Sequence, residues 1–292
     1  MSAALSPVLL EPYAAMAAPA APDREFSFDR PDFERVRELI YQRAGISLQP
    51  GKQAMVYSRL SRRLRETGHR SFAEYLAQLE RGGAGEAEWQ EFVNCLTTNL
   101  TNFFREEHHF PLLAQALQQR RGKPLRIWCN AASTGEEPYS LAMTVAETLG
   151  EQASVKILAS DIDTKVLAAA SRGVYDADAR GLTPERLKAH FLRGMGANAG
   201  AIRVKPELQR LIEFRSFNLM STSWSLGEPF DIVFCRNVMI YFDAATQRRV
   251  LDSMHRAMKP GGLLFVGHSE NFTDMRELFR LRGKTVYERV GG

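Results

Sequence analysis

The sequence has few of the residues that form disulfides or bind metals, and it has no long apolar run. Its three cysteines lie far apart, each inside an apolar segment, which predicts reduced thiols in the core of a cytoplasmic protein. Among six histidines only His108 and His109 are close together. Their side chains would diverge on a helix, so no metal site is expected. No apolar run approaches the roughly 20 residues of a membrane helix, so no membrane insertion is expected.

Charge is nearly balanced, with 38 basic and 34 acidic residues. The resulting field is too weak to indicate nucleic-acid binding by itself. Residues 1–25 are rich in alanine and proline and have no charged region before their short apolar stretch. This composition favours a disordered tail over a cleaved signal peptide. The whole chain is 45% hydrophobic and 10% aromatic, which is enough for a globular core.

Residues 26–96 carry a helical pattern, which predicts a small all-helical domain. One helix should begin after the cap Asp29, because a proline follows at the first helical position, and should end at Gly45. Another should begin at the sequence Ser71 to Glu74, a capping box in which each side chain accepts from the backbone of the other residue.

From residue 124 onward the pattern changes to strands alternating with helices, and no strand candidate precedes it. Residues 97–123 are expected to be a linker that also contacts the ligand. Alternation of this kind predicts a mainly parallel sheet with helices on both faces, a Rossmann-like α/β domain over 124–292. A Gly-rich interruption predicts a small antiparallel β-subdomain inserted at about 191–217. Strands are expected near 125–130, 154–160, 211–217, 230–236, 262–267 and 284–289, with helices near 137–148, 164–171, 183–191 and 244–258.

A strand-to-helix turn at residues 126–140, RIWCNAASTGEEPYS, stands where α/β proteins bind nucleotides. Gly135 allows the backbone to approach a ligand closely. The turn has one glycine, no lysine and two carboxylates, so it would repel a phosphate. Glu136 suits a cationic or hydroxyl-bearing ligand instead. An ordinary strand-to-helix turn without a ligand is the alternative.

The next predicted strand ends in Asp161-Ile162-Asp163. An acid roughly 20 to 25 residues beyond the glycine turn is placed to accept both hydroxyls of a ribose. The other aspartate is free to cap the following helix. Together the two strand ends describe a ligand with a ribose and a positive charge but no phosphate. S-adenosylmethionine has these properties and is the expected cofactor.

Two further stretches are candidates for the site. The strand in FDIVFCRNVMIYF, residues 230–242, ends at Arg236-Asn237 and lacks the Pro-Pro-aromatic and Pro-Cys motifs of nucleobase methyltransferases. Cys235 within it is interpreted as a core residue. Residues 97–106, TTNLTNFFRE, hold more hydroxyls and amides than a linker needs, and they are expected to close over the ligand. A polar loop with a helix cap is the alternative.

Arg59, Arg62 and Arg63 share one face of a predicted helix. A solvent-exposed face is the ordinary meaning of such a cluster, and the functional alternatives are an acidic protein partner or a nucleic acid. Because no series of aromatic residues accompanies the arginines, the acidic protein is favoured over the nucleic acid.

Five strings occur in order: TTNLTNFFRE, AASTGEEPYS, ASDID, FCRNVMIYF and GHSENF. Through them residues 26–290 closely resemble the CheR family of chemotaxis receptor methyltransferases. The resemblance implies a monomeric, S-adenosylmethionine-dependent protein-glutamate O-methyltransferase that releases S-adenosylhomocysteine. It also implies a helical domain, a Rossmann-like domain and an inserted β-subdomain. The implied cofactor contacts are Asn99, Thr101, Arg105, Glu136, Asp161, Asn218, Leu219, Arg236 and Asn237.

The resemblance places Arg105 and Tyr241 near the methyl-transfer centre as catalytic residues. The substrate carboxylate is already ionised at neutral pH, so it would need orientation rather than a general base. A non-catalytic S-adenosylmethionine-binding adaptor is disfavoured because both residues are present. A nucleic-acid methyltransferase is disfavoured by the missing nucleobase motifs. Asn130 departs from the family pattern, which has a small residue there.

The resemblance also implies two contacts with the receptor. Family members that bind a pentapeptide at the receptor's carboxyl terminus tend to carry a Gly-X-Gly loop in the β-subdomain, and the loop containing Gly194 and Gly196 is similar. The basic face of Arg59, Arg62 and Arg63 would align the acidic receptor helices at the mouth of the site.

Overall fold

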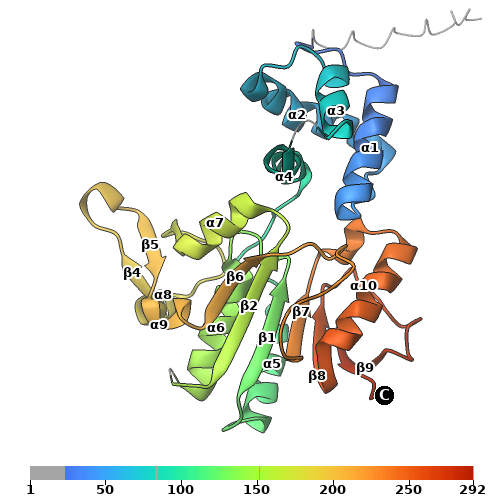
Figure 1. The fold of residues 1–292 in the computed structure, drawn as a ribbon. Coiled ribbons are helices and arrows are strands. Elements are labelled where there is room, and N and C mark those ends of the chain that lie inside the picture. The colour runs from blue at the N-terminus through green and yellow to red at the C-terminus, as the bar shows by residue number, and fades with distance from the viewer. Residues whose placement is uncertain (1–23, 83–84, 151, 292) are drawn as a thin grey trace, which may run out of the picture.

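The computed structural model describes residues 24–82, 85–150 and 152–291. A helical part lies above the carboxyl ends of the central strands of a seven-stranded sheet, and a three-stranded sheet projects to one side (Figure 1). This arrangement confirms the expected α/β fold with a preceding helical part and an inserted antiparallel β-subdomain. No helix in the described ranges is long and apolar enough to cross a membrane.

The helical part consists of α1 (Arg30–Ala44), α2 (Gln53–Thr67), α3 (Phe72–Glu80) and α4 (Gly85–Leu96). As predicted, α1 is capped by Asp29 and ends at Gly45, which has a φ of 71°. The hydroxyl of Ser71 accepts from the amide of Glu74 at 3.1 Å and caps α3. The return bond differs from the prediction, because the Glu74 carboxylate accepts from the amide of Arg70 rather than from that of Ser71.

Most of the expected disordered tail, residues 1–25, lies outside the described residues. For its last two residues the prediction is wrong. Glu25 pairs with Arg65 at 3.0 Å, and the guanidinium of Arg24 lies 4.8 Å from the ring centroid of Tyr57. Both residues therefore pack against α2.

The large sheet has the strand order β6-β2-β1-β7-β8-β10-β9. The strands from β6 to β8 are parallel, β10 pairs antiparallel with β8, and β9 pairs antiparallel with β10. The bounds of the strands are β1 (Leu125–Asn130), β2 (Val155–Asp161), β6 (Ile212–Ser216), β7 (Phe230–Cys235), β8 (Met258–Val266), β9 (Phe279–Gly283) and β10 (Val286–Arg289).

Helices cover both faces of this sheet, because successive side chains of each strand point to opposite faces. Ile127 and Cys129 pack toward α5 (His109–Gln119) and α6 (Glu136–Leu149). Trp128 and Cys235 pack on the opposite side with α10 (Ala244–Ala257). Leu167 of α7 (Thr164–Arg172) covers the β2 and β6 edge. Cys129 and Cys235 are fully buried free thiols, as expected.

Helix α5, which occupies much of the expected linker, and strand β9, which has the sequence FRLRG with four exposed residues, were not predicted. Both were compatible with the sequence, because a proline is tolerated in the first turn of a helix and apolar and charged residues alternate in β9. The division into separate domains at residues 26–96 and 124–292 stays a prediction.

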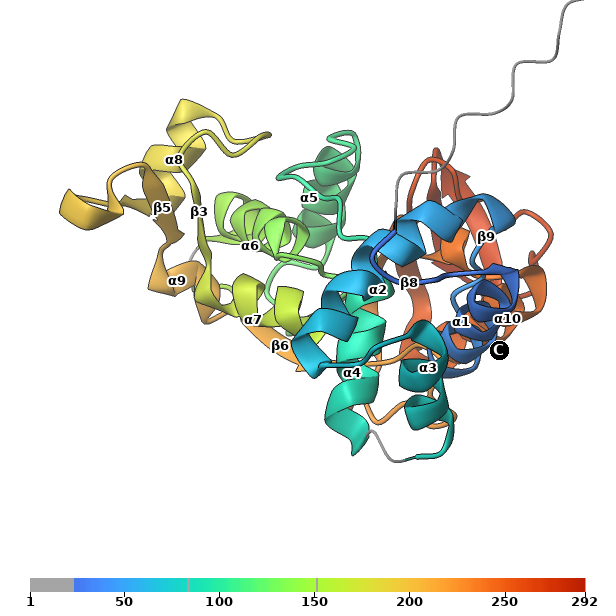
Figure 2. The ribbon, with the colours of Figure 1, turned by 90° about the horizontal axis from the view of Figure 1, so that it is seen from above.

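The small sheet has the order β3-β5-β4, with β3 (Val174–Asp176), β5 (Ala201–Val204) and β4 (Phe191–Arg193). It differs from the expected insertion at about 191–217 at both ends. The upstream strand β3 is too short to give a periodic signal, and β6 belongs to the large sheet. The short helices α8 (Pro184–His190) and α9 (Pro206–Gln209) flank the small sheet. Figure 2 shows it on the opposite side of the molecule from α1 and α10.

Candidate functional site

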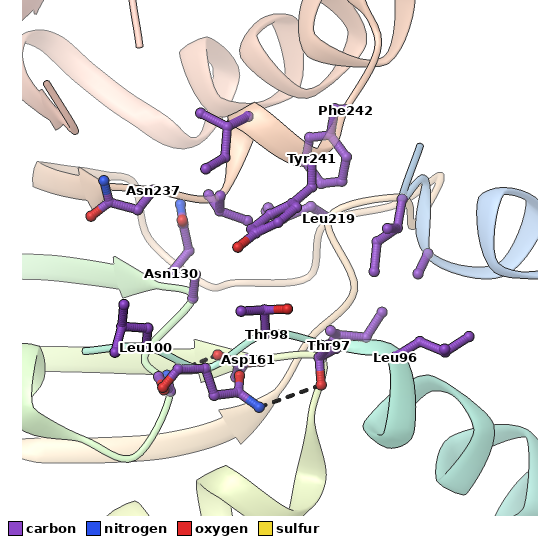
Figure 3. A pocket seen from close by; sticks show the side chains of 18 of the residues that line it. Leu96, Thr97, Thr98, Leu100, Asn130, Asp161, Leu219, Asn237, Tyr241 and Phe242 are labelled. Atoms are coloured by element: carbon purple, nitrogen blue, oxygen red, sulfur yellow. Dashed lines mark hydrogen bonds between the residues drawn. The ribbon is translucent and has the colours of Figure 1, made fainter. Parts of the chain in front are cut away.

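A cavity of about 350 Å³ lies between the helical part and the carboxyl ends of β1, β2 and β7 (Figure 3). The chain runs from β1 outward through β2 to β6 and then returns to β7 on the other side of β1. Such a reversal of strand order opens a crevice for ligands. Residues between 44 and 55 and between 96 and 105 complete the walls. The volume is in the range of ordinary cofactor sites, ~300 to 1,000 Å³.

The structure brings most of the predicted site residues to this cavity, although their contacts with a cofactor stay predictions. Tyr241 lines it, and Glu136 does not. The predicted cofactor residues that line it are Asn99, Thr101, Arg105, Asp161, Asn218, Leu219, Arg236 and Asn237.

The turn after β1 is built differently from the prediction. Gly135 has a φ of 99°, and a Cβ there would lie 2.8 Å from the Cβ of Ala170 and 2.7 Å from the hydroxyl of Tyr175. This glycine is therefore required for packing against α7 and β3 rather than for approach to a ligand, since it does not line the cavity. The residue that faces the cavity is Ser133, whose amide donates to Asp161 at 2.8 Å.

The two aspartates after β2 have separate roles. Asp161 lines the cavity, is 8% exposed and accepts from the amides of Ser133 and Asp163. Burial raises the pKa of its carboxyl to about 6, although these backbone donors oppose the shift. Asp163 caps α7 and accepts from Thr97 at 2.7 Å and Asn99 at 2.9 Å. Asp161 is therefore the carboxylate available to a ligand in the cavity.

Of the two adjacent acids at the start of α6, the one that lines the cavity is Glu137, not Glu136. Consecutive helical residues point about 100° apart, so only one of the pair can face the strand ends. Glu136 accepts from the hydroxyl of Thr134 at 2.7 Å. Glu137 is buried and accepts from the guanidinium of Arg236 at 2.5 Å. No sequence pattern separates these two neighbours.

The Arg236 guanidinium is fixed among protein groups, with its side chain 1% exposed. Besides Glu137 it contacts Glu106 at 3.6 Å and donates to the backbone oxygen of Arg105 at 2.5 Å. Burial alone would raise the pKa of Glu106, but a hydrogen bond from His268 and the charge of Arg236 lower it to about 2. Glu137 and Glu106 therefore balance the charge of Arg236. Its hydrogen bond to the backbone oxygen of Arg105 connects it to the segment that carries this second arginine.

The two proposed catalytic side chains lie on different walls. Arg105 is half-exposed and donates to the backbone oxygen of Leu100 at 2.8 Å. Tyr241 lies in the short helix η3 (Met239–Tyr241), and its backbone oxygen accepts from the amide of Ser47 at 2.8 Å. Figure 3 shows its hydroxyl pointing into the cavity. Among the described residues, no histidine lines this cavity.

Asn130 at the end of β1 is 1% exposed and lines the cavity. Neither its amide nitrogen nor its oxygen has a hydrogen-bond partner among the described residues. The polar group beside it is the Cys235 thiol, which is a weak donor and acceptor. An unsatisfied buried amide costs roughly 1–3 kcal/mol, so a ligand that bonds to it would recover this free energy.

Asn218 and Leu219 follow β6 and link the cavity to the helical part. The Asn218 amide donates to the backbone oxygen of Arg43 at 2.8 Å, and its oxygen accepts from the amide of Met220 at 2.9 Å. Leu219 adds an apolar wall. The cavity is therefore shaped jointly by the helical part and the sheet.

The structure does not bring the three arginines of α2 together as a free basic face. Arg63 is 18% exposed and pairs with Glu88 and Glu66, and these contacts further raise the pKa of its guanidinium. Arg59 donates to the backbone oxygen of Thr97 at 2.6 Å. Arg62 remains largely exposed, beside Glu66. Arg63 and Arg59 are therefore engaged by Glu88 of α4 and by the loop after α4, and the proposed role of the three arginines in receptor binding stays a prediction.

The glycines of the predicted Gly-X-Gly loop are both required by the backbone. A Cβ on Gly194 would lie 2.0 Å from the backbone oxygen of Asn198, and Gly196 has a φ of 59°. Met195 between them is 83% exposed.

The adjacent histidines do not diverge as expected, because the ring centroids of His108 and His109 lie 4.2 Å apart. With Glu106 they form a group whose ligand atoms lie within 4.8 Å of one another. Burial lowers the pKa of His109 to about 3, and the nearby Arg236 acts in the same direction. That guanidinium, which also contacts Glu106, opposes a bound cation.

Comparison with known proteins gives matches over both parts of the chain. Residues 31–97 match the family model described as the CheR methyltransferase all-alpha domain, and residues 99–288 match the CheR methyltransferase SAM binding domain. A chemotaxis protein methyltransferase of Klebsiella aerogenes is 54% identical over 257 residues, which cover 87% of this chain and 88% of the relative. Chemotaxis protein methyltransferase 2 of Pseudomonas aeruginosa is 53% identical over 274 residues, which cover 92% and 97%.

Proposed function

The chain belongs to the CheR family of chemotaxis methyltransferases, and from this premise we propose that it methylates glutamate side chains of methyl-accepting chemotaxis receptors in the cytoplasm. Its cofactor is S-adenosylmethionine, because the matched domain is described as SAM binding. The products would be glutamate methyl esters and S-adenosylhomocysteine. We further propose that it acts as a monomer.

The residues of the cavity fit this cofactor. Asp161 is a buried acceptor suited to ribose hydroxyls, and the unpartnered amide of Asn130 offers both a donor and an acceptor. When bound, the cofactor supplies an electrophilic methyl group on a sulfonium. We propose that Asn99, Thr101, Asn218 and Leu219 complete its binding site.

The observation that carries the choice of substrate is the chemistry of the cavity wall. Arg105 and Lys52 supply positive charge, Tyr241 supplies a hydroxyl, and among the described residues no histidine is present to act as a base. A glutamate with a pKa of about 4.3 needs no base at neutral pH. It needs a fixed orientation.

The Arg105 guanidinium is suited to orient the carboxylate without fully engaging it. Because one of its nitrogens already donates to Leu100, only the remaining donors can face the substrate. Such partial pairing matters, since a carboxylate bound too tightly to a cation is a weaker nucleophile. The Tyr241 hydroxyl would give the carboxylate a second hydrogen bond from the other wall.

The test is incubation with the organism's own receptor membranes and labelled S-adenosylmethionine, followed by base treatment. We expect labelled methanol, because carboxyl esters hydrolyse in base whereas methylated nucleobases do not release methanol. Label that enters receptors in a base-stable form would contradict the glutamate substrate. Cofactor binding without any transfer would favour a non-catalytic adaptor.

We also propose that the small sheet binds the receptor's carboxyl-terminal peptide. Across this sheet the exposed residues Val174, Arg203 and Leu192 lie in one row, and Met195 extends beyond them. An extended peptide can add to a sheet edge as a further strand, and Arg203 would attract an acid or a terminal carboxylate. The sheet lies on the opposite side of the molecule from α1 and α10 (Figure 2), and none of its strand residues lines the cavity, so such a contact would tether the receptor and leave the site free.

A further inference from the structure

The motif GHSENF, residues 267–272, supplies none of the cofactor or catalytic residues proposed above. It follows β8, which pairs with β7 in the sheet, so it lies beside the loop that carries Arg236 and Asn237. Glu270 at its centre is 5% exposed. Among the described residues, no lysine or arginine forms an ion pair with this carboxylate.

Backbone amides surround the Glu270 carboxylate. One oxygen accepts from the amides of Val238 at 3.0 Å and Met239 at 2.8 Å. The other accepts from Asn237 at 3.0 Å and Gly267 at 2.6 Å. Four donors thus fill the acceptor sites of a carboxylate, and three of them belong to consecutive residues of the loop after β7.

The loop after β7 begins with an unfavourable backbone conformation, so contacts from outside the loop are needed to hold it. Asn237 has a φ of 57°, in the left-handed region. Gly267 packs directly against it: a Cβ on Gly267 would lie 2.5 Å from the side-chain nitrogen of Asn237, 3.0 Å from its backbone nitrogen and 3.0 Å from a Glu270 carboxylate oxygen. The glycine and the glutamate of the motif therefore act on the same three-residue segment.

The anchored segment leads directly to Tyr241. Its far end is held separately, because Gln247 of α10 donates to the backbone oxygens of Met239 and Phe242, and Ser47 donates to that of Tyr241. Glu270 is the anchor at the near end. From these contacts we infer that Glu270 is a positioning residue for methyl transfer, which fixes the loop that carries Asn237 and orients Tyr241.

Glu270→Gln tests this inference with little change in shape. Glutamine keeps one acceptor oxygen, and its NH2 group would point at two amides that can only donate. We expect the loop to loosen and Tyr241 to lose its fixed place, so that kcat falls by ~10- to 100-fold, the size of effect that small misplacements cause. The cofactor dissociation constant should change less than kcat, because the loop carries Asn237 among the predicted cofactor contacts whereas Asp161, on the far wall, is not bonded to Glu270.

Amide hydrogen exchange supplies a readout that needs no substrate. In Glu270→Gln, the peptide containing residues 237–241 should lose protection while α6 and β2 keep theirs. Glu277→Gln is the matched control, because Glu277 lies later in the same loop, is 54% exposed and pairs with Arg248. We expect the control to match the wild type in exchange and in turnover. Gly267→Ala should reproduce the Glu270→Gln pattern.

The measurement of kcat rests on the proposed function, whereas the measurements of amide hydrogen exchange and of cofactor binding do not. If the wild type methylates no receptor, the proposed function fails and exchange still decides the role of Glu270. The inference is overturned if Glu270→Gln retains kcat within twofold of the wild type. It is equally overturned if activity falls only in proportion to the unfolded fraction, with protection at 237–241 unchanged.

Discussion

The Arg236 guanidinium donates to the backbone oxygen of Arg105 at 2.5 Å. Through this bond a buried arginine at the end of β7 fixes the segment that carries the exposed arginine proposed to orient the substrate. Glu137 and Glu106 hold Arg236 in turn. Arg236 therefore has a structural role, whereas the guanidinium of Arg105 remains available for the proposed reaction.

Replacing Arg236 should destabilise the protein strongly. In Arg236→Met the buried carboxylate of Glu137 and the partly buried carboxylate of Glu106 lose their cation, and breaking a buried pair in this way costs about 3–5 kcal/mol. Urea unfolding should measure that loss. Combination with Glu137→Gln should recover part of it, because one buried charge is then removed. Arg248→Met, on an arginine that is 46% exposed, should cost less than about 1 kcal/mol. Equal losses for the two arginine variants would contradict the buried network.

Arg105→Ala should reduce methyl transfer while leaving the fold intact. Its side chain is half-exposed and, within the described part of the chain, bonds only to Leu100, so circular dichroism should stay native. Loss of orientation should lower kcat about 100-fold. Arg121→Ala, on an exposed arginine after α5, is the control and should leave kcat unchanged. Turnover of Arg105→Ala within a few-fold of the wild type would rule out the catalytic role.

Cofactor affinity should fall as pH decreases through about 6. Burial raises the pKa of Asp161 to about 6, so below that pH its carboxyl is protonated and loses acceptor capacity. The same shift has the opposite sign for folding: the native state holds this proton more tightly than the unfolded chain, so this contribution to stability is greatest below about pH 4 and is lost as pH rises to about 6.

Calorimetry between pH 5 and 8 would measure the dependence of affinity on pH. In Asp161→Asn it should flatten, with affinity lower by about 1.5–3 kcal/mol at neutral pH. Asp178→Asn, on an exposed aspartate, should keep the wild-type profile. A wild-type dissociation constant that is constant from pH 5 to 8 would contradict the role of Asp161.

The sequence predicted the location of the site better than its contacts. Strand periodicity placed the ends of β1, β2 and β7 correctly, and the geometry of a parallel sheet then brought Asp161, Arg236 and Asn237 to one cavity. That alternation predicted the mainly parallel sheet, whereas the order of its strands and the reversal beside β1 were not predicted. Local capping signals at Asp29 and Ser71 were also sufficient to place their helices.

What the sequence did not predict depends on packing between distant segments. The choice between Glu136 and Glu137 is settled by the rotation of α6 on the sheet. The pairing of Arg63 with Glu88 depends on how α2 and α4 pack. Gly135 was assigned to a ligand because glycine lets the backbone approach one closely, whereas its contacts with Ala170 and Tyr175 exist only in the folded chain.

Asn130→Ala should separate binding from stability. Removing an unpartnered buried amide relieves a cost of roughly 1–3 kcal/mol, partly offset by the small cavity left behind, so the ligand-free protein should be as stable as the wild type or more stable. Cofactor affinity should fall, because the amide is a proposed ligand contact. Thermal unfolding with and without cofactor measures both effects. An unchanged dissociation constant would show that Asn130 does not contact the cofactor.

The last prediction concerns the small sheet as a tether. Peptides from the carboxyl termini of the organism's receptors should bind the intact protein, and deletion of residues 194–196 should abolish this binding while cofactor affinity stays unchanged. The deletion removes a turn that depends on the close approach at Gly194 and on the left-handed Gly196.

Because deletion also disturbs the sheet, Arg203→Ala provides a milder test. Arg203 is exposed between Val174 and Leu192, so its loss should weaken peptide binding without unfolding the sheet. Tethering raises the local concentration of receptor helices to the order of millimolar, so both variants should methylate intact receptors slowly and should match the wild type on receptors without the peptide. If no receptor peptide binds the wild type, the small sheet is not a tether and only the untethered enzyme remains.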